Sequence, residues 1–363
     1  MQKIFALGLH KTGSTSLQRF LLANQTRLAK DGIFYPPVTP AALSRLIADT
    51  TDRLAPDSPE RLNEVMAHNA LAYRLLADAR PEQTFPQVHR PMFTGQLALN
   101  MVRDMAGTMR AQSVIFCSED LARAALHAPE IPSRFADTFG RGDVTIMATI
   151  RRPDDAIAAW QSQRLEFGAP FPALSQDGLG DYLGSVHFDF RRALSPWLDA
   201  FPGARVILTP YRDTLTIGGA ARHFADACNL PPDLTFPENS NVSLPYALIG
   251  LSRQAFAQLS PRDASRFRDH LKTAATRLPL PANDAVDLFG PGQRDELYRA
   301  FAPIHDWLNQ VSGRAPFFDD LDQVTRPRRF SEPEAQAHVL PAVIKDAETH
   351  LDSPETHAFL RSL

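Results

Sequence analysis

Hydrophobic positions in this chain follow two different spacings. Some form short continuous runs, rich in β-branched and aromatic residues, which have the length and composition of buried strands. Others recur every three or four positions, as on one face of a helix, beginning with Ser14–Leu28. We expect the main strands at Lys3–Leu9, Ser113–Cys117, Val144–Ile150 and Ala204–Thr209.

Helical spacing separates these runs and then dominates the rest of the chain. A further short strand is expected at Ile33–Tyr35. The expected helices are Pro56–Ala79, Gln96–Arg110, Glu130–Phe139, Pro153–Phe167, Leu179–Phe201, and residues 218–228, 244–259, 261–277, 293–309 and 331–350. Strands that alternate with helices form parallel sheets with both faces covered. The order therefore predicts an α/β fold, a three-layer parallel sheet flanked by helices, with a mainly helical C-terminal portion.

Composition limits the ligands that the surface as a whole can attract. Hydrophobic residues make up 44% of the chain, charged residues 22%, and the formal net charge is −3. No overall positive field therefore favours nucleic acid, and an anionic ligand would need a local positive site. Two cysteines, Cys117 and Cys228, argue against a disulfide scaffold or a cysteine-rich zinc site.

Length and hydropathy also bear on organisation. The chain has no run of about 18 apolar residues, and its first apolar segment is too short for the core of a signal peptide. These patterns predict a cytoplasmic protein without a membrane span. The 363 residues allow one large domain or two. We expect one domain over residues 1–325 and a C-terminal helical tail over 326–363, joined by the basic segment Thr325–Arg329.

The first strand leads directly into a loop of small residues. The segment Gly8–Thr15, with the sequence GLHKTGST, has the Gly-x4-Gly spacing of a phosphate-binding loop, and a helix follows it. Such a loop binds an anion through converging backbone N–H groups at the helix N-terminus. A plain tight turn is the alternative. Lys11 lies two residues before Gly13, whereas an ATP-binding Walker A loop places its lysine directly after the second glycine.

Residues Leu9–Leu17 resemble the 5′-phosphosulfate-binding loop of sulfotransferases that use 3′-phosphoadenylyl sulfate (PAPS), in its bacterial form. The resemblance implies a P-loop-type sheet. It also implies that Lys11 contacts the oxygen bridging phosphate and sulfate and stabilises the leaving phosphate, since positioning and charge stabilisation carry most of the catalysis in such in-line transfers. The residues expected to bind the phosphosulfate group are Lys11, Thr12, Gly13, Ser14, Thr15 and Ser16.

The segment Val144–Asp155 resembles the 3′-phosphate-binding segment of the same family, in which a strand ends in arginine and a proline opens a helix. Arg151 matches the family arginine and would bind the 3′-phosphate through its guanidinium. The family serine, eight residues after the arginine, is Ala159 here, and Ser162 is the expected substitute. The alternative places Arg151 and its neighbour Arg152 in surface ion pairs with nearby acids.

Transfer to a hydroxyl or amine benefits from a general base. Glu119 is the first candidate, because it follows the strand Ser113–Cys117 and strand carboxyl ends line the ligand crevice of open α/β sheets. Its surroundings also resemble a Ser-Ser-Glu segment of bacterial family members. A helix-capping acid is the alternative. His10, in the loop, is a second catalytic candidate that would orient the sulfate, and His68 and His89 are weaker ones.

Later segments extend the resemblance over roughly residues 3–255. Ala204–Tyr211 and Asn239–Leu244 look like later segments of the family. The C-terminal segment that closes over the cofactor in cytosolic members is not recognisable, and the nearest basic cluster lies in residues 326–329.

The sequence thus predicts a sulfotransferase that moves a sulfuryl group from PAPS to a small-molecule, carbohydrate or lipid acceptor and releases adenosine 3′,5′-bisphosphate (PAP). No metal and no nucleic-acid partner are expected. One alternative is an ATP- or GTP-dependent P-loop kinase, with Mg²⁺-binding acids in Val114–Asp120. Another is a non-catalytic nucleotide-binding module of the same fold, suggested by Ala159. The sequence specifies neither the acceptor nor the oligomeric state.

Overall fold

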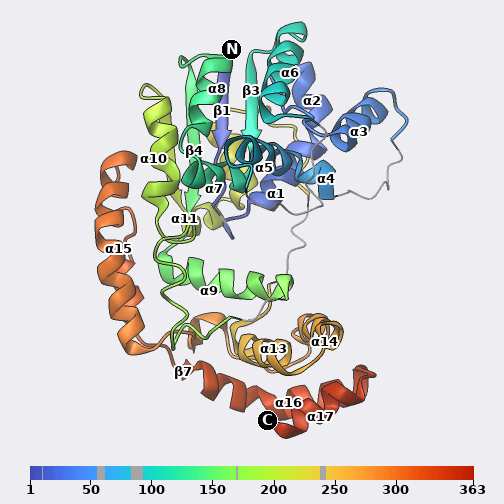
Figure 1. The fold of residues 1–363 in the computed structure, drawn as a ribbon, viewed down its shortest axis with the longest axis vertical. Helices are drawn as coiled ribbons and strands as arrows, with labels where there is room; N and C mark the ends of the chain where they lie inside the picture. The colour runs from blue at the N-terminus through green and yellow to red at the C-terminus, as the bar shows by residue number, and fades with distance from the viewer. Residues whose placement is uncertain (10, 55–61, 83–92, 169–170, 238–242) are drawn as a thin grey trace. The chain divides into compact units, whose positions relative to one another are not determined.

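A five-stranded parallel sheet forms the centre of the first part of the chain (Figure 1). The computed structural model describes all residues except 10, 55–61, 83–92, 169–170 and 238–242. The strand order is β2-β3-β1-β4-β5, and every neighbouring pair is parallel. The strands are β1 Gln2–Ala6, β2 Ile33–Phe34, β3 Ser113–Cys117, β4 Val144–Ile150 and β5 Arg205–Pro210. The predicted parallel α/β sheet is confirmed.

Side chains of β1 alternate between two apolar cores, one on each face of the sheet. Ile4 and Ala6 belong to a core shared with helices α1 (Ser14–Ala23), α2 (Gln25–Lys30) and α12 (Ala220–Ala227). Phe5 points the other way, since successive residues of a strand face opposite sides. It packs in an aromatic cluster with Phe116, Phe135, Trp197 and Phe201.

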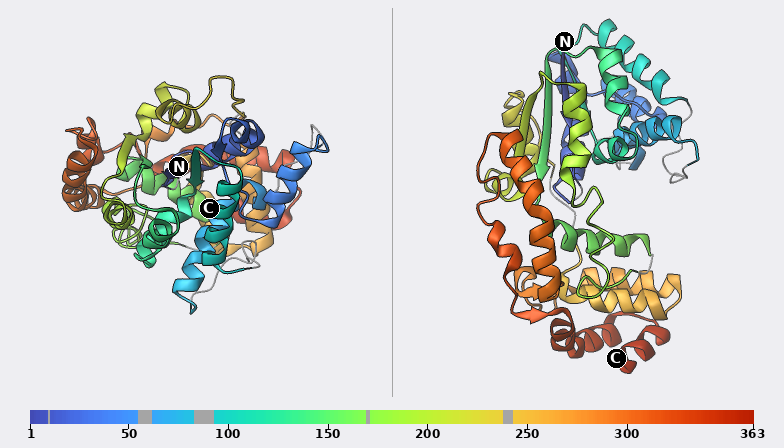
Figure 2. Two further views of the ribbon diagram at one scale, coloured as in Figure 1. Left: turned by 90° about the horizontal axis from the view of Figure 1, so that it is seen from above. Right: turned by 60° about the vertical axis from the view of Figure 1, so that its left-hand side comes forward.

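The aromatic cluster is covered by a second helical layer. Its helices are α7 (Glu119–His127), α8 (Ile131–Phe139) and α10 (Phe190–Ala200), with α5 (Ala67–Ala79) and α6 (Gly95–Thr108) packed against them. In the right-hand view of Figure 2 the strands run side by side with helices on either side. Helices on both faces bury both surfaces of the sheet, as a parallel sheet requires.

The chain divides into two compact units. The first comprises Met1–Arg151, Asp189–Asn239 and Ile304–Phe318, and the second comprises Arg152–Phe188, Ser240–Pro303 and Asp319–Leu363. The first unit also contains α3 Pro40–Thr50, α4 Leu62–Val65 and α11 Tyr211–Thr216. Helix α15, Pro291–Ser312, contributes residues to both units.

The second unit is mainly helical. Helix α13 packs against α14 and α16, and α16 also contacts α17. A two-stranded parallel pair, β6 with β7, joins segments far apart in the sequence, Val286 lying opposite Phe330. The elements are α9 Pro153–Arg164, α13 Tyr246–Gln258, α14 Pro261–Ala274, β6 Val286–Asp287, β7 Phe330–Ser331, α16 Glu332–His350 and α17 Pro354–Ser362, with short 3-10 turns at Leu165–Phe167, Asn283–Ala285 and Leu321–Thr325.

Two expected helices have different boundaries in the structure. The helix expected over Ser14–Leu28 ends at Ala23, because the Asn24 side chain exchanges hydrogen bonds with the backbone of Thr235. The helix expected over Leu179–Phe201 begins only at Phe190, where Asp189 caps it by accepting from the Arg192 amide. Helices α3, α7, α11 and α17 were not expected.

The boundary expected at residue 325 does not coincide with either unit. Residues from Asp319 to the C-terminus pack with earlier segments of the second unit rather than forming a separate tail. The segment Thr325–Arg329 is anchored, because the Arg328 amide donates to the Asp287 carboxylate and strand β7 follows directly.

Among the residues that the structure describes, no helix is both long and apolar enough to cross a membrane.

Candidate functional site

Three sequence segments meet at one edge of the sheet. Strand β1 lies between β3 and β4, and the chain runs from β1 to β2 on one side of it and then crosses from β3 to β4 on the other. Ligands of open parallel sheets bind beyond the carboxyl ends of the strands at such a switch point. The loop after β1, Glu119 after β3 and Arg151 after β4 all lie at these ends. The candidate site therefore assembles from the three segments singled out in the sequence.

The loop after β1 has an unusual backbone. Lys11 has a φ of 63° and Gly13 a φ of 87°, both in the left-handed region, which a non-glycine residue such as lysine adopts rarely. The Thr12 hydroxyl is buried and donates to the Leu9 carbonyl, which closes the turn. Gly13 is the N-cap of α1 and has no side chain to accept from the first amides of the helix. Such amides are the groups that bind anions at helix N-termini.

Gly8 allows the loop, α1 and α7 to approach closely. A Cβ atom at this position would lie 2.8 Å from the Cβ of Ser14 and 3.4 Å from the Cα of Glu119. The Ser14 hydroxyl donates a hydrogen bond to the Glu119 carboxylate. Any larger residue at position 8 would separate these two side chains.

The Glu119 carboxyl occupies the first position of α7 and is half-buried. Burial raises its pKa above the ordinary value, while the hydrogen bond from Ser14 and the charges of Lys11 and Arg123 act in the opposite direction. A raised pKa makes the ionised carboxylate a stronger base, which suits a group that takes a proton during catalysis. It also lies in the first turn of a helix, as the capping alternative expected.

A buried polar network fixes the start of α7. Ser118 caps the helix by accepting from the Asp120 amide at 3.0 Å and donates to the Asn69 side chain at 2.7 Å. The same oxygen of Asn69 accepts from Gln18 of α1 at 2.9 Å. Helices α1, α5 and α7 are thus tied together next to Glu119, which restricts the orientations of its carboxylate. The role of Asn69 could not be identified from the sequence, because its hydrogen-bond partners are distant in the chain.

His68, a weak catalytic candidate, has a structural environment. It is fully buried, and its Nδ1 lies 3.0 Å from the amide nitrogen of Cys117 while its Nε2 lies 2.8 Å from the carbonyl oxygen of Pro36. Nδ1 therefore accepts and Nε2 donates, which is the hydrogen bonding of one neutral tautomer. Burial lowers the pKa of His68 to about 4. This histidine supports the end of β3 instead of facing a ligand.

Arg151 lies beside the loop. Its Nη1 donates to the carbonyl of Lys11 at 3.2 Å, and its guanidinium stacks over the Tyr211 ring at 5.0 Å from the centroid. Its Nε is buried without a hydrogen-bond partner among the described residues. A guanidinium held by a carbonyl and a ring, with donors left over, can still bind an anion bidentately.

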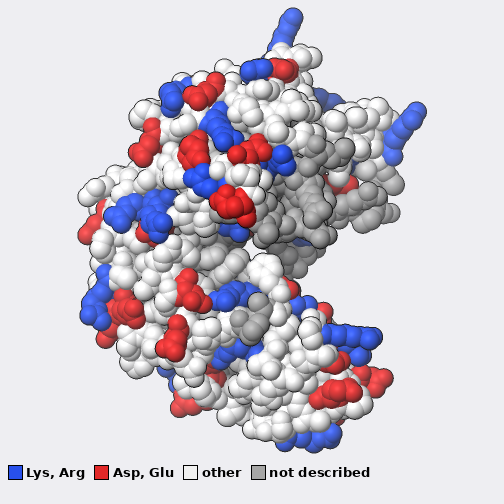
Figure 3. All heavy atoms as spheres, viewed as in Figure 1, with Lys and Arg blue, Asp and Glu red and all other residues white. Residues whose placement is uncertain are grey.

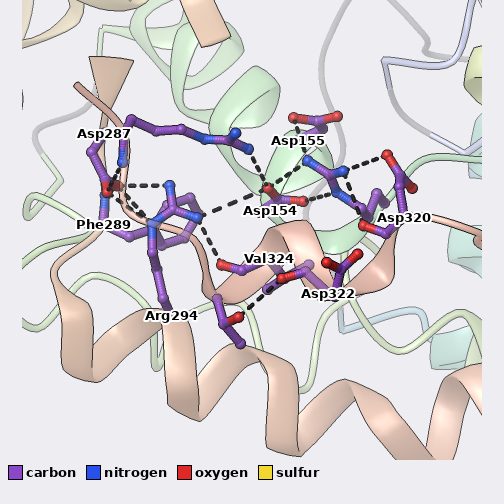
Figure 4. Close-up of polar contacts among 11 residues, drawn as sticks. Asp154, Asp155, Asp287, Phe289, Arg294, Asp320, Asp322 and Val324 are labelled. Atoms are coloured by element: carbon purple, nitrogen blue, oxygen red, sulfur yellow. Dashed lines mark hydrogen bonds and ion pairs between the residues drawn. The ribbon is translucent and has the colours of Figure 1, made fainter. Parts of the chain in front are cut away.

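Arg152, in contrast, is not the surface residue that the alternative interpretation expected. It is buried in the second unit and bonds the Asp154 carboxylate at 2.7 and 2.9 Å and Asp320 at 2.6 Å (Figure 4). Asp154 also contacts Arg328 at 3.3 Å, and Arg294 lies between it and Asp287. Each of the three arginines thus faces a carboxylate within this network. Arg152 and Arg328 are engaged structurally.

The remaining predicted residues belong to the second unit or lie outside the described residues. Ser162 belongs to the second unit, is buried, and its hydroxyl is within 3.4 Å of the Leu244 carbonyl. Ala159 is likewise buried in α9. His10 and His89 lie outside the described residues, as does most of the segment 239–244. The structure therefore brings together Lys11, the described remainder of the loop, Glu119 and Arg151, all in the first unit, whereas Ser162 belongs to the second.

The space around the loop is small and its charge is local. A cavity of about 20 Å³ lies beneath the loop, lined by Gly8, Thr12, Ser14 and neighbouring strand and helix residues. This volume suits a single water molecule, so a nucleotide would have to lie outside it. On the face drawn in Figure 3 basic and acidic side chains are interspersed. Anion binding at the loop would therefore depend on the loop and its immediate neighbours.

No protein-family model matches this chain, and no curated protein or solved structure is detectably similar to it. The functional interpretation rests on the geometry of the site and on the resemblance of its motifs.

Proposed function

We propose that this chain is a sulfotransferase that uses PAPS as its sulfuryl donor. The observation that carries the proposal is the contact between Ser14 and Glu119 beside Lys11, which combines a basic loop with a carboxyl of raised pKa. Sulfuryl transfer needs these two functions close together. A cation must stabilise the leaving phosphate, and a base must take the proton of the acceptor.

The residues present fit the two charged ends of PAPS. The phosphosulfate group would lie against the amides after Gly13, with the Lys11 ammonium nearby. The 3′-phosphate would be bound by Arg151, whose Nε is buried without a partner among the described residues. The proposal makes no use of Ser162.

The acceptor oxygen or nitrogen forms a bond to sulfur as the bond between sulfur and the bridging phosphate oxygen breaks. The acceptor proton passes to the Glu119 carboxylate, and PAP leaves with its additional negative charge beside Lys11. The Ser14 hydroxyl donates to one carboxylate oxygen of Glu119 and so helps to orient the group that would take that proton.

One observation favours a second candidate, a P-loop kinase. In nucleoside triphosphatases a hydroxyl of the loop and an acid after a buried strand hold Mg²⁺ together. Ser14 and Glu119 have that relation, since their side chains are in direct contact. The position of Lys11 before Gly13 argues against this candidate, because the kinase lysine follows the second glycine.

Calorimetry with PAP and ADP tests the donor assignment. We expect the wild-type chain to bind PAP more tightly than ADP, because ADP has no 3′-phosphate for Arg151. Arg151→Ala should weaken PAP binding by about tenfold to a hundredfold, the usual value of hydrogen bonds to a charged group, and should weaken ADP binding less, because ADP loses only the support that Arg151 gives to the loop. Arg103→Ala, on the exposed face of α6, is the matched control and should alter neither.

Equal affinity for PAP and ADP, or a PAP affinity that Arg151→Ala does not change, would contradict the assignment. Tight ATP binding that requires Mg²⁺ and is lost in Ser14→Ala would instead support the kinase.

A further inference from the structure

A groove of about 640 Å³ lies on the first unit, away from the loop. It is bounded by α8 and α10, which contact one another (Figure 1), and by the segment after α7. None of its lining residues belongs to the loop, Glu119 or Arg151. Its volume falls within the range of small-molecule sites.

The charged lining of the groove is predominantly positive. Arg141, Arg191 and Arg192 are all exposed there, and Asp199 is the one acid among the lining residues. Arg141 is 3.5 Å from Asp137, in an ion pair exposed to solvent. The lining residues thus include three arginines and one acid, although the chain as a whole is slightly acidic.

The position of two of these arginines is unfavourable for the helix that carries them. Arg191 and Arg192 occupy the first turn of α10, which has no acid in that turn. The N-terminus of a helix carries partial positive charge, so cations there are unfavourable. The Asp189 carboxylate caps this helix end by accepting from the Arg192 amide. A bound anion would be stabilised by both arginines and by the helix end.

His127 lies within the influence of one arginine of the groove. It is the last residue of α7, a position at which the helix dipole normally favours a protonated histidine. Its pKa is nevertheless lowered, first by partial burial and then by the charges of Arg123 and Arg192. Arg192, which lines the groove, therefore contributes to this lowered pKa.

We propose that this groove is a second binding site, for a phosphate or sulfate monoester with an apolar body. Arginine guanidinium groups bind such oxyanions bidentately, and the hydroxyls of Ser133 and Ser195 in the groove wall supply further donors. Leu126, Pro129 and Pro196 form an apolar surface against which the organic part of the ester would pack. The proposal does not depend on the function assigned to the loop.

Titrating the full chain with phenyl phosphate and phenyl sulfate, while following the His127 imidazole resonance by NMR, tests this site. We expect a saturable shift and a raised His127 pKa, because a bound anion offsets Arg192. The double variant R191Q/R192Q should weaken binding at least about tenfold and raise the His127 pKa without ligand. Comparing the two esters shows which oxyanion the site prefers, and phenol controls for the ring alone.

Arg103→Gln, an exposed arginine on α6, is the matched control and should leave both measurements unchanged. The proposal fails if neither ester moves the His127 resonance, if phenol moves it equally, or if the double variant retains full affinity. Should the double variant not fold, the single variants R191Q and R192Q give the same comparison, each with a smaller expected loss.

Discussion

Glu119 lies at the candidate site, and its ionised form reduces the stability of the fold. A carboxyl whose pKa is raised by folding adds stability below its unfolded pKa, and that stability is lost as the pH rises through the folded pKa. Burial raises the pKa of Glu119, so its ionised form opposes folding at neutral pH. The ionised form is also the one that would accept a proton from an acceptor.

Glu119→Gln should therefore be more stable than the wild type at about pH 7 and indistinguishable from it below about pH 4, where both are neutral. The amide oxygen can still accept from Ser14. If Glu119 is the base, the same variant should lose sulfuryl transfer by about a hundredfold or more. Chemical unfolding at several pH values measures the stability, and transfer assays measure the activity.

Glu130→Gln is the matched control, with the opposite sign. Although partial burial acts to raise the pKa of Glu130, its hydrogen bonds, chiefly from Arg80, lower it. Neutralising it should reduce stability at neutral pH, and the difference should vanish as the pH falls through that lowered pKa. A Glu119→Gln protein that is less stable than the wild type at pH 7 would contradict the argument for Glu119.

Much of the site at this scale could be predicted from sequence. Lys11, Glu119 and Arg151 each follow a recognisable strand, and strand ends gather at one edge of a parallel sheet. The roles of His68 and Asn69 could not be predicted, because their partners come from other helices and strands. Neither could the separation of Arg151 from Arg152, which are adjacent in sequence but bond to different groups.

At the scale of elements, the start of α9 depends on a buried carboxylate. Pro153 opens this helix as the sequence predicted, and Asp154 lies in its first turn, where an acid is favoured. Besides the neighbouring Arg152, the arginines around Asp154 belong to distant segments, at positions 294 (Figure 4) and 328. Local pattern could not identify these distant partners, and it therefore suggested exposed ion pairs.

Asp154→Ala should destabilise the second unit by about 3–5 kcal/mol, because it leaves Arg152 buried with fewer compensating charges. Asp322→Ala removes an exposed ion pair with Arg326 and should change stability by less than about 0.5 kcal/mol. Denaturant unfolding compares the two variants. Equal losses would mean that the buried network contributes no more than a surface pair.

At the scale of the whole molecule, the sequence predicted the class of fold better than the division of the chain into compact units. The alternation of strands and helices was sufficient to predict a parallel α/β sheet. The order of the strands was not predictable, because β1 pairs with β3 and β4, neither of which is the next strand in the sequence. The two-residue strands β6 and β7 are too short for any periodic signal. Without that pairing, the C-terminal residues had the pattern of a separate tail.

Removing residues 326–363 should therefore destabilise the second unit, whereas the loss of a separate tail would not. The truncation deletes β7, α16 and α17, whose buried side chains include Val339, Val343 and Phe359. Each such side chain contributes about 1.5–3 kcal/mol by its burial. We expect α13 and α14 to lose protection in hydrogen exchange, whereas removing only residues 361–363 should leave it intact. Retained protection in the longer truncation would show that the segment is dispensable.

The conformation of the loop after β1 depends on residues outside the loop. Lys11 and Gly13 keep left-handed backbone angles, and the loop is held by contacts from outside itself. Arg151 bonds the Lys11 carbonyl, and Gly13 lies so close to Ala220 that an added Cβ would be 2.9 Å from its side chain. The octapeptide GLHKTGST is consequently not a portable module. Placed after a strand in another protein, the octapeptide would keep its sequence but not this backbone conformation. A graft would also have to include the residues at the C-terminal end of β4 and the N-terminal end of α12.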